Sequence, residues 1–258
     1  MTSPNPLPWR HAWVTGAGRG IGAALCEALS RAGVRVTASA RNRAELEALQ
    51  QRCANLPGPI EPAPLDITDP QQIHALCQHW QARDDWPQLA VLNAGTHDPF
   101  GAADFSTERC QQLWQTNLLG TCHCLEPVMK QMLETGSGHI AVMASSAGYR
   151  GLPTAAAYGA GKAALIHLAE SLYPELQNHG VKLQVINPGF VRTPLTDRNE
   201  FPMPDLMEAD DAASALLKGL CSDRFEIIFP RRFVTFLKLL RLLPYGLYFP
   251  LIRRITGV

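Results

Sequence analysis

The chain lacks several features that would place it in a specialised class of protein. Its seven cysteines are scattered and include no Cys-x-x-Cys pair, which argues against a disulfide framework. Acidic and basic residues are equal in number, at 23 each, so the net charge does not favour nucleic acid as a partner. Residues 1–8 are polar and proline-rich and lack the charged and apolar regions of a signal peptide. We therefore expect a cytoplasmic protein with reduced thiols.

The sequence also offers little that would bind a metal ion. The closest group of metal-ligand residue types is Cys122-His123-Cys124. On a helix, side chains two positions apart point nearly opposite ways, so these two thiols do not converge on one ion. We therefore predict no metal site.

The order of apolar and helical patterns predicts the fold class. With 258 residues, 46% hydrophobic and 18% charged, the chain is expected to form a single globular domain over residues 1–258. Short apolar runs alternate with helical patterns, which favours an α/β fold: a doubly wound, Rossmann-like parallel sheet of about seven strands with helices on both faces. The predicted strands span residues 11–14, 35–39, 60–64, 89–93, 139–144, 182–187 and 225–229. The predicted helices span residues 20–32, 42–54, 69–82, 107–134, 158–179 and 208–221.

Tyr158 and Lys162 are four positions apart in a predicted helix, and Ser145 lies thirteen residues before the tyrosine. Residues i and i+4 share a helix face, so the phenol and the ammonium project into one pocket. A free tyrosine, with a pKa of about 10, is a poor acid near neutrality. A neighbouring cation favours the phenolate, so we predict that Lys162 lowers the pKa of Tyr158 and that Ser145 holds a substrate oxygen. An exposed helical pair is the alternative interpretation of the same spacing.

A glycine-rich segment follows the first predicted strand. The segment Thr15-Gly16-Ala17-Gly18-Arg19-Gly20-Ile21-Gly22 lies between that strand and a helical run, which is the context of a dinucleotide-binding turn. Glycines let the backbone approach a pyrophosphate, and the N-terminus of the following helix favours its negative charge. A glycine-rich turn without a ligand is the simpler alternative. The tyrosine and lysine downstream favour the dinucleotide site.

Together these motifs resemble the short-chain dehydrogenase/reductase family over residues 10–230. The segment from Thr15 to Gly22, the run Asn93-Ala94-Gly95 and the pair Pro188-Gly189 match three family landmarks in order. The resemblance implies a catalytic tetrad of Asn117, Ser145, Tyr158 and Lys162. The cofactor-binding residues that it implies are Thr15, Gly16, Arg19, Gly20, Ile21, Gly22, Arg41, Asp66, Asn93, Ala94, Gly95, Tyr158, Lys162, Pro188, Gly189, Val191 and Thr193.

The end of the second predicted strand indicates which nicotinamide cofactor is bound. An NAD site places a carboxylate here for the adenosine ribose, whereas this chain has Ala40 followed by Arg41. Arg19 lies in the glycine-rich turn, and two guanidinium groups suit a 2′-phosphate. Both positions match the NADP-preferring pattern of the family, so we predict NADP(H) as the cofactor, with Arg43 as an additional contact. Solvated surface arginines are the alternative.

The resemblance implies hydride transfer between the nicotinamide and a carbonyl or secondary alcohol. In that scheme Tyr158 gives its proton to the substrate oxygen, Lys162 also holds the nicotinamide ribose, and Asn117 positions a water that links Lys162 to solvent. An Asn117 bonded only to backbone and an Asp66 that only caps a turn are alternatives. Ser146 is an alternative hydroxyl, but its spacing to Tyr158 is one residue short of the family's. The alternative functions are a 3-oxoacyl reductase acting on acyl-carrier protein and a catalytically silent dinucleotide sensor.

Residues 231–258 form an apolar and basic C-terminal extension. They contain six basic residues and no acid, which leaves 17 basic and 23 acidic residues in the remainder of the chain. Their longest uncharged stretch, Leu242 to Ile252, is too short to span a bilayer and contains prolines. The extension can lie in a membrane interface, giving peripheral membrane association, or it can pack over the pocket or against a partner subunit. Either role suggests a small lipophilic carbonyl or alcohol as substrate.

The loop after the sixth predicted strand, residues 196–207, matches the family's substrate loop, which closes over the pocket and excludes water. The predicted substrate-binding residues are Ser145, Leu152, Tyr158, Phe190, Phe201 and Met203. Anchoring of the loop to the core is the alternative role for its apolar residues. Helices 107–134 and 158–179 commonly form the subunit interface in this family, so the resemblance implies a homodimer or homotetramer.

Overall fold

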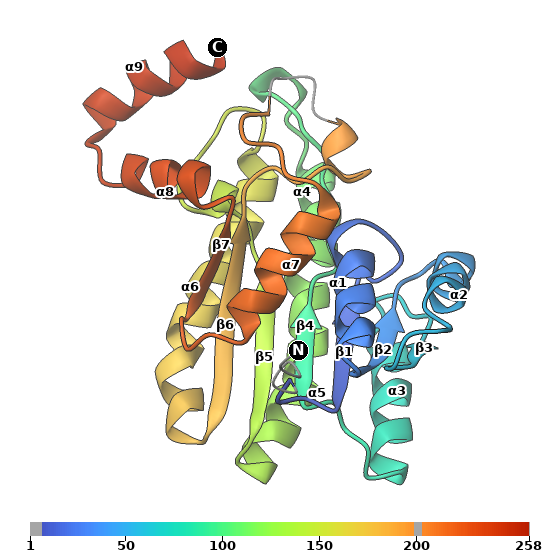
Figure 1. The fold of residues 1–258 in the computed structure, drawn as a ribbon. Coiled ribbons are helices and arrows are strands. Elements are labelled where there is room, and N and C mark those ends of the chain that lie inside the picture. Colours follow the sequence, from blue (N-terminus) through green and yellow to red (C-terminus); the bar gives the residue numbers. More distant parts are fainter. Residues whose placement is uncertain (1–6, 199–202, 258) are drawn as a thin grey trace, which may run out of the picture.

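The computed structural model describes residues 7–198 and 203–257. Within these ranges the chain forms a seven-stranded parallel sheet in the order β3-β2-β1-β4-β5-β6-β7 (Figure 1). The chain runs outward from β1 to β3, returns to place β4 beside β1, and then runs outward to β7 on the other side. This reversal between β1 and β4 is the switch point of a doubly wound sheet, where ligands bind. The predicted fold class is confirmed.

The strands and most helices agree with the predicted patterns to within two residues at each end. The strands are β1 (His11–Thr15), β2 (Arg35–Ser39), β3 (Ile60–Pro62), β4 (Leu89–Leu92), β5 (Gly138–Met143), β6 (Val181–Pro188) and β7 (Glu226–Phe229). The helices are α1 (Gly20–Arg31), α2 (Arg43–Arg52), α3 (Pro70–Ala82), α4 (Thr107–Trp114), α5 (Gly120–Thr135), α6 (Ala156–Asn178), α7 (Ala209–Leu220), α8 (Arg231–Leu240) and α9 (Tyr245–Thr256).

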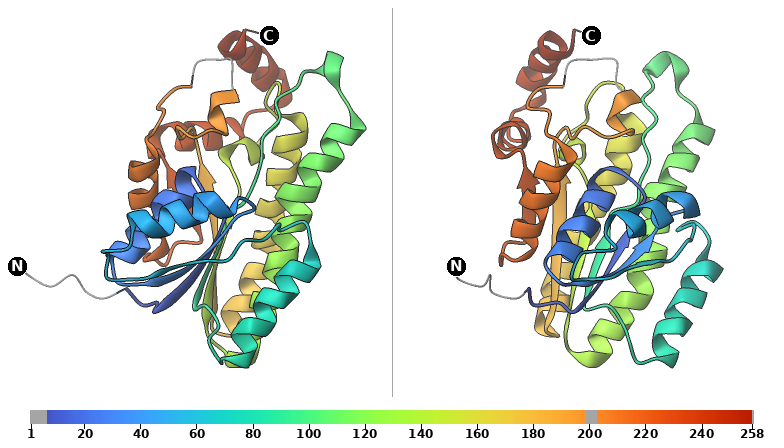
Figure 2. Two further views of the ribbon diagram at one scale, coloured as in Figure 1. Left: turned by 90° about the vertical axis from the view of Figure 1, so that its right-hand side faces the viewer. Right: turned by 45° about the vertical axis from the view of Figure 1, so that its right-hand side comes forward.

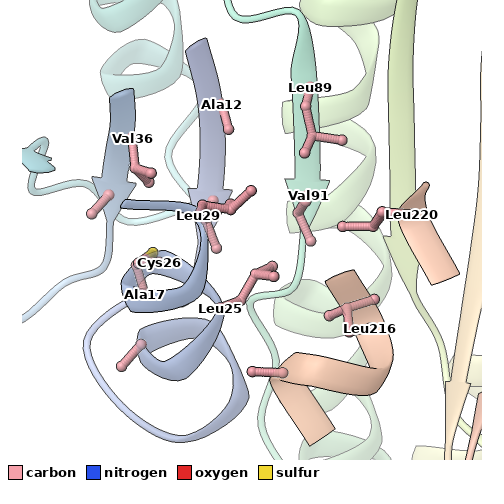
Figure 3. Close-up of a cluster of buried hydrophobic side chains, with 14 of the residues drawn as sticks. Ala12, Ala17, Leu25, Cys26, Leu29, Val36, Leu89, Val91, Leu216 and Leu220 are labelled. Atoms are coloured by element: carbon pink, nitrogen blue, oxygen red, sulfur yellow. The ribbon is translucent and has the colours of Figure 1, made fainter. Parts of the chain in front are cut away.

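Helices cover both faces of the sheet (Figure 2). On one face α1, α2 and α7 pack against the strands, and Leu25 of α1 and Leu216 of α7 are fully buried there. On the other face α3, α5 and α6 form the second core, which includes Leu125 and Leu165. Figure 3 shows the first core, with side chains of α1 and α7 directed toward those of β1, β2 and β4. Because both faces of the sheet are buried, the strands carry apolar side chains on both faces.

The predicted helix over residues 107–134 is wrong as a single element. The structure divides it into α4, a π-helical segment (Gln115–Leu119) and α5. A π turn holds one residue more than an α turn, so it shifts the faces of the helix that follows it. Asn117 lies within this segment and is only 1% exposed.

Glu226, at the start of β7, joins the C-terminal extension to the sheet. Its carboxylate accepts hydrogen bonds from the Tyr149 hydroxyl (2.6 Å) and Asn187 Nδ2 (2.7 Å), and it pairs with Lys238 of α8. Burial alone would raise the pKa of Glu226, but these three partners hold it below its ordinary value. The charged carboxylate therefore stabilises the fold at neutral pH, and protonation removes that contribution.

We expect Glu226→Gln to lower the free energy of unfolding by about 2 kcal/mol at pH 7, because charge-assisted hydrogen bonds are lost. The native pKa lies below the ordinary one, so the contribution is present above the ordinary carboxyl pKa and is lost as the pH falls through the lowered value. Urea unfolding at pH 7 and near pH 3 should show a difference that shrinks in acid. Glu126→Gln, in the exposed pair with Lys130, should cost much less, because exposed ion pairs contribute little to stability. Equal losses in the two variants would contradict this account.

Candidate active site

A cleft of about 910 Å³ lies at the carboxyl ends of the strands, at the switch point. Its volume is at the upper end of the range for ligand pockets, which suits an extended molecule. Most of the predicted site residues border it. They are Gly16, Arg19, Gly20, Ile21, Gly22, Arg41, Asp66, Asn93, Ala94, Gly95, Ser145, Tyr158, Lys162, Pro188, Gly189, Val191 and Thr193. The fold thus brings together motifs that are more than 170 residues apart in the sequence.

Two side chains hold β1 and β4 together at the switch point. Thr15 Oγ1 accepts hydrogen bonds from the backbone N–H groups of Asn93 (3.0 Å) and Ala94 (3.1 Å). Asn93 Nδ2 donates to the carbonyl oxygens of Thr15 (2.9 Å) and Gly16 (3.3 Å). Thr15 therefore fixes the two strand ends relative to each other, although among the described residues it does not border the cleft.

Gly16 and Gly22 allow the close packing of the glycine-rich turn. Gly16 has a φ of +67°, and a Cβ on it would lie 2.8 Å from Ala94 Cα. A Cβ on Gly22 would lie 2.2 Å from the carbonyl oxygen of Gly16. Neither position has room for a side chain, so the backbone itself forms this wall of the cleft. The first turn of α1 borders the cleft through Gly20 and Ile21, and the N–H groups at a helix N-terminus suit a phosphate.

Three of the predicted catalytic side chains meet at the cleft. Ser145 precedes a 3₁₀ turn after β5, where its Oγ accepts a hydrogen bond from the Ala147 N–H at 3.1 Å. Tyr158 and Lys162 come from the first two turns of α6, and Lys162 Nζ lies 5.8 Å from the centroid of the tyrosine ring. Lys162 is buried and donates a hydrogen bond to the Met143 carbonyl oxygen at 2.7 Å.

The electrostatics of these three groups differ from the prediction. Burial raises the pKa of Tyr158 above its ordinary value, and a hydrogen bond with Ser145 opposes that rise without cancelling it. Burial also lowers the pKa of Lys162 to about 8. The predicted net fall in the pKa of Tyr158 is therefore wrong for this structure, because desolvation of the phenol is the largest influence on it, and Lys162 Nζ is bonded to the Met143 carbonyl oxygen. At neutral pH the phenol keeps its proton.

Asn117 binds the backbone rather than bordering the cleft. Its Oδ1 accepts a hydrogen bond from the Thr96 N–H (2.7 Å) and its Nδ2 donates to the Thr96 carbonyl oxygen (2.8 Å). Thr96 follows Gly95 directly, so Asn117 fixes the loop that leaves β4. This is the alternative considered from the sequence, and it gives Asn117 a positioning role. Asp66 accepts hydrogen bonds from the N–H (2.9 Å) and hydroxyl (2.8 Å) of Thr68, as in the turn-capping alternative, and it also borders the cleft, so its contact with a cofactor stays a prediction.

Only part of the predicted substrate wall borders the cleft. Ser145 and Tyr158 do so, whereas Phe201 lies outside the described residues. The predicted residues that are described but do not border the cleft are Leu152, Phe190 and Met203. Ser146 is also described and does not border it, which favours Ser145 as the functional hydroxyl.

Two of these side chains pack against the C-terminal extension. Leu152 packs in a small apolar cluster with Tyr248 of α9, and the ring centroids of Phe190 and Phe233 of α8 are 5.2 Å apart. Leu152 and Phe190 therefore contact the extension, and their contact with a substrate stays a prediction. Other side chains from α4, the π-helical segment and the loop after β6 border the cleft instead: Gln112, Leu113, Thr116 and Leu195.

Four residues near the site were not found by sequence reasoning: Glu45, His97, Asp98 and Arg109. The ring of His97 meets that of Tyr158 edge to face, with centroids 4.6 Å apart. Arg109 of α4 pairs with Asp98 at 2.6 Å, and both border the cleft. Glu45 of α2 also borders it. Each is brought there by the packing of a loop or helix, and the only local signal is that His97 and Asp98 closely follow the Asn93-Ala94-Gly95 motif.

Comparison with known proteins identifies the family. The family model for short chain dehydrogenases matches residues 10–202. The chain belongs to the short-chain dehydrogenase family. An uncharacterised oxidoreductase of Myxococcus xanthus (strain DK1622) is 36% identical to this dehydrogenase over 249 residues, which are 96% of this chain and 98% of that protein. Because the match covers so much of this chain, it includes most of the C-terminal extension.

Solved structures show the same fold. A short-chain dehydrogenase from Sphingobium yanoikuyae in complex with NADPH has a TM-score of 0.78 and 27% identity, and the match covers 85% of this chain and 87% of that one. A short chain dehydrogenase/reductase from Burkholderia phymatum in complex with NAD has a TM-score of 0.79 and 24% identity, with 91% and 94% covered. This short-chain dehydrogenase is therefore an oxidoreductase with a fold that binds a nicotinamide dinucleotide, and its structural neighbours include complexes with both cofactors.

All seven cysteines of this short-chain dehydrogenase are free thiols, and most are buried. Burial raises the pKa of Cys77 to about 11 and that of Cys124 further still, which keeps these thiols protonated and unreactive. In residues 7–198 and 203–257, no three side chains of histidine, cysteine, aspartate or glutamate are grouped so as to hold a metal ion.

Proposed function

We propose that this dehydrogenase is an NADP(H)-dependent oxidoreductase that interconverts a carbonyl and a secondary alcohol on a small lipophilic substrate. The observation that carries the proposal is the convergence of Ser145, Tyr158 and Lys162 on the cleft that also contains the glycine-rich turn. In carbonyl reduction the oxygen must gain a proton as the carbon gains a hydride, and a half-buried phenol beside a buried cation suits that proton transfer. A homodimer or homotetramer, as the family resemblance implies, is part of the proposal.

The cleft fits a nicotinamide dinucleotide. Its walls at Gly16 and Gly22 are bare backbone, and the N-terminus of α1, which borders the cleft at Gly20 and Ile21, would hold a pyrophosphate through its N–H groups. Val191 and Thr193, after β6, border the cleft from a separate loop, and Thr193 lies close to the glycine-rich turn, since a Cβ on Gly20 would be 2.9 Å from Thr193 Cγ2. When bound, the nicotinamide supplies or accepts the hydride, and the protein orients the reactants and supplies charge.

Tyr158 acts as the proton donor in the direction of reduction. Because its pKa lies above the ordinary value, the phenol is protonated at neutral pH and ready to donate. Ser145, which shares a hydrogen bond with the phenol, holds the substrate oxygen beside it. Lys162 has a pKa of about 8 and is mostly charged below that pH, so its ammonium stabilises the phenolate that remains once the proton has left.

The charges around the cleft support NADP(H) over NAD(H). Arg19 and Arg41 both border the cleft, next to the ends of β1 and β2. Glu45 is a carboxylate in the same wall, but the three side chains together still carry one net positive charge. A phosphate on the adenosine ribose suits this arrangement better than a bare ribose does. Arg43 pairs with Glu47 at 2.7 Å and does not border the cleft, so the proposal does not rely on a contact between Arg43 and the cofactor.

We expect Arg41→Asp to raise the Kd of NADPH by roughly thirtyfold, because one charge-assisted contact with the 2′-phosphate is replaced by repulsion. Binding of NADH should be unchanged or tighter. Titration of each cofactor by intrinsic fluorescence measures both constants. Arg43→Asp is the matched control, since it makes the same charge change on the neighbouring exposed side chain. If the ratio of the two Kd values stayed the same in Arg41→Asp, the cofactor assignment would be withdrawn.

The function itself is tested by following NADPH oxidation with a panel of aliphatic and aromatic ketones and aldehydes. Turnover of apolar carbonyls would support the proposal. Tight NADPH binding without turnover of any substrate would instead indicate a dinucleotide sensor. Turnover restricted to 3-oxoacyl thioesters on acyl-carrier protein would indicate the related reductase.

A further inference from the structure

We propose that the outer face of α8 and α9 is a docking surface for an anionic lipid bilayer. The surface consists of the exposed side chains of residues 231–257. This surface does not include the catalytic groups, so the proposal can be tested separately from the proposed reaction. Four observations carry it: apolar exposure, the arrangement of that exposure on two helices, charge, and a rigid attachment to the body of the protein.

Exposed apolar side chains are concentrated in this segment. Ten large hydrophobic residues are exposed in the described chain, and seven of them lie between residues 236 and 255. Leu242 is 79% exposed, Tyr245 69% and Leu247 62%. The seven are Phe236, Leu239, Leu242, Tyr245, Leu247, Phe249 and Ile255. Such a concentration is uncommon on a protein surface that contacts only water and marks an interaction site.

The exposure follows the two helices, each of which has a second apolar face. Phe236 and Leu239 are three positions apart and share the outer side of α8, while Val234 on its inner side is completely buried. In α9, Tyr245 and Phe249 are four positions apart, and their rings stack with centroids 5.4 Å apart. The inner faces of the two helices pack against the body of the protein, so their outer faces remain available to bind another partner.

Charge favours an anionic partner. The segment contains six basic residues and no acid, and of these only Lys238 pairs with an acidic side chain, Glu226, within the described residues. Arg253 lies four positions after Phe249, on the same side of α9. Apolar side chains flanked by arginine are typical of helices that lie in the interface of an anionic bilayer.

A second copy of this chain is a poorer match for the same surface. A two-fold contact places a patch against itself, so the unpaired arginines of one copy would face those of the other. Such like-charge contacts are unfavourable, whereas phospholipid headgroups supply the missing negative charge. No helix of the described residues is long and apolar enough to cross a membrane, so the contact we infer is with the surface of the bilayer.

The two helices are attached firmly to the body of the protein. Arg150 Nη1 donates to the carbonyl oxygens of Leu240 (2.7 Å) and Leu243 (2.6 Å), at the end of α8. Its guanidinium also lies 3.9 Å from the ring centroid of Tyr248, whose hydroxyl donates to the Gly151 carbonyl oxygen. All views show α9 at the end of the molecule toward which the parallel strands point (Figures 1 and 2). The docking surface therefore lies at the same end of the sheet as the cleft.

The test is flotation of the full-length protein with vesicles of phosphatidylcholine alone and of equal parts phosphatidylcholine and phosphatidylglycerol. We expect binding to the anionic vesicles only, with loss of binding at about 0.5 M salt. Arg253→Gln combined with Arg254→Gln should weaken binding roughly thirtyfold at low salt. Leu242→Ser combined with Phe249→Ser should weaken it by at least about tenfold. All four side chains are exposed, so thermal melting should confirm that the variants fold as the wild type does.

Phe105→Ser is the matched control, because Phe105 is 62% exposed on a different part of the surface, and its vesicle binding should equal that of the wild type. No wild-type binding, equal binding to both kinds of vesicle, or full binding by either double variant would overturn the proposal. Light scattering supplies a further check. A dimer that dissociates in the Leu242→Ser and Phe249→Ser variant would assign this surface to a second copy instead. Vesicle binding needs no turnover, so a failure here is distinct from a failure of the proposed reaction.

Discussion

Replacing Tyr158 by phenylalanine is expected to lower kcat for carbonyl reduction by about a thousandfold, the typical contribution of a positioned general acid. The ring remains, so its contact with His97 and the packing of α6 are preserved. Only the proton donor and its hydrogen bond with Ser145 are lost. NADPH affinity should therefore change by no more than about threefold, since the hydroxyl acts on the substrate oxygen.

Steady-state turnover with NADPH and a reactive ketone measures the effect, and fluorescence titration measures cofactor binding. Tyr173→Phe is the control, because Tyr173 lies in the same helix, packs edge to face on Phe225 and does not border the cleft. It should retain wild-type turnover. A Tyr158→Phe enzyme with wild-type kcat would remove the phenol from the mechanism.

The backbone of the site could be predicted from the sequence because its motifs lie at the ends of parallel strands. Gly16, Asn93 and Ser145 each follow a strand and Pro188 is the last residue of one, and parallel strands place their carboxyl ends along one edge. The substrate wall could not be predicted in the same way. Leu152 has no periodic pattern to place it, and its position depends on helix α9, almost one hundred residues later in the chain.

The sign of the pKa shift at Tyr158 was beyond sequence reasoning for a related reason. Spacing shows that the lysine and the tyrosine share a helix face, and this alone predicts a lowered pKa. The extent of burial and the bond between Lys162 and Met143 depend on how α6 packs against β5, which the local sequence does not reveal. The C-terminal extension shows the same limit: its composition indicates an amphipathic segment, but only the fold shows which side chains face outward.

Replacing Lys162 by methionine is expected to lower kcat/KM by roughly a hundredfold and at the same time to make the protein more stable. The loss of activity follows from removing the cation that stabilises the phenolate. The gain in stability follows from burial, which lowers the pKa of Lys162 from 10.5 to about 8. Such a shift corresponds to about 3 kcal/mol of unfavourable desolvation at neutral pH. Loss of the hydrogen bond to the Met143 carbonyl oxygen destabilises the variant by about 1 kcal/mol. The variant is therefore expected to be about 2 kcal/mol more stable than the wild type at pH 7.

The pH dependence separates this explanation from a simple gain in packing. Between about pH 8 and 10.5 the unfolded chain holds the lysine proton more tightly than the folded one, so wild-type stability rises with pH in that window. The advantage of Lys162→Met should therefore shrink and nearly vanish by about pH 10. Urea unfolding of both proteins at pH 7 and pH 10 tests this, with Lys130→Met, on the exposed surface of α5, as a control that should change little at either pH. A variant less stable than the wild type at pH 7 would mean that the ammonium of Lys162 stabilises the fold. A buried lysine at this position would then be explained by stability alone, without a role in catalysis.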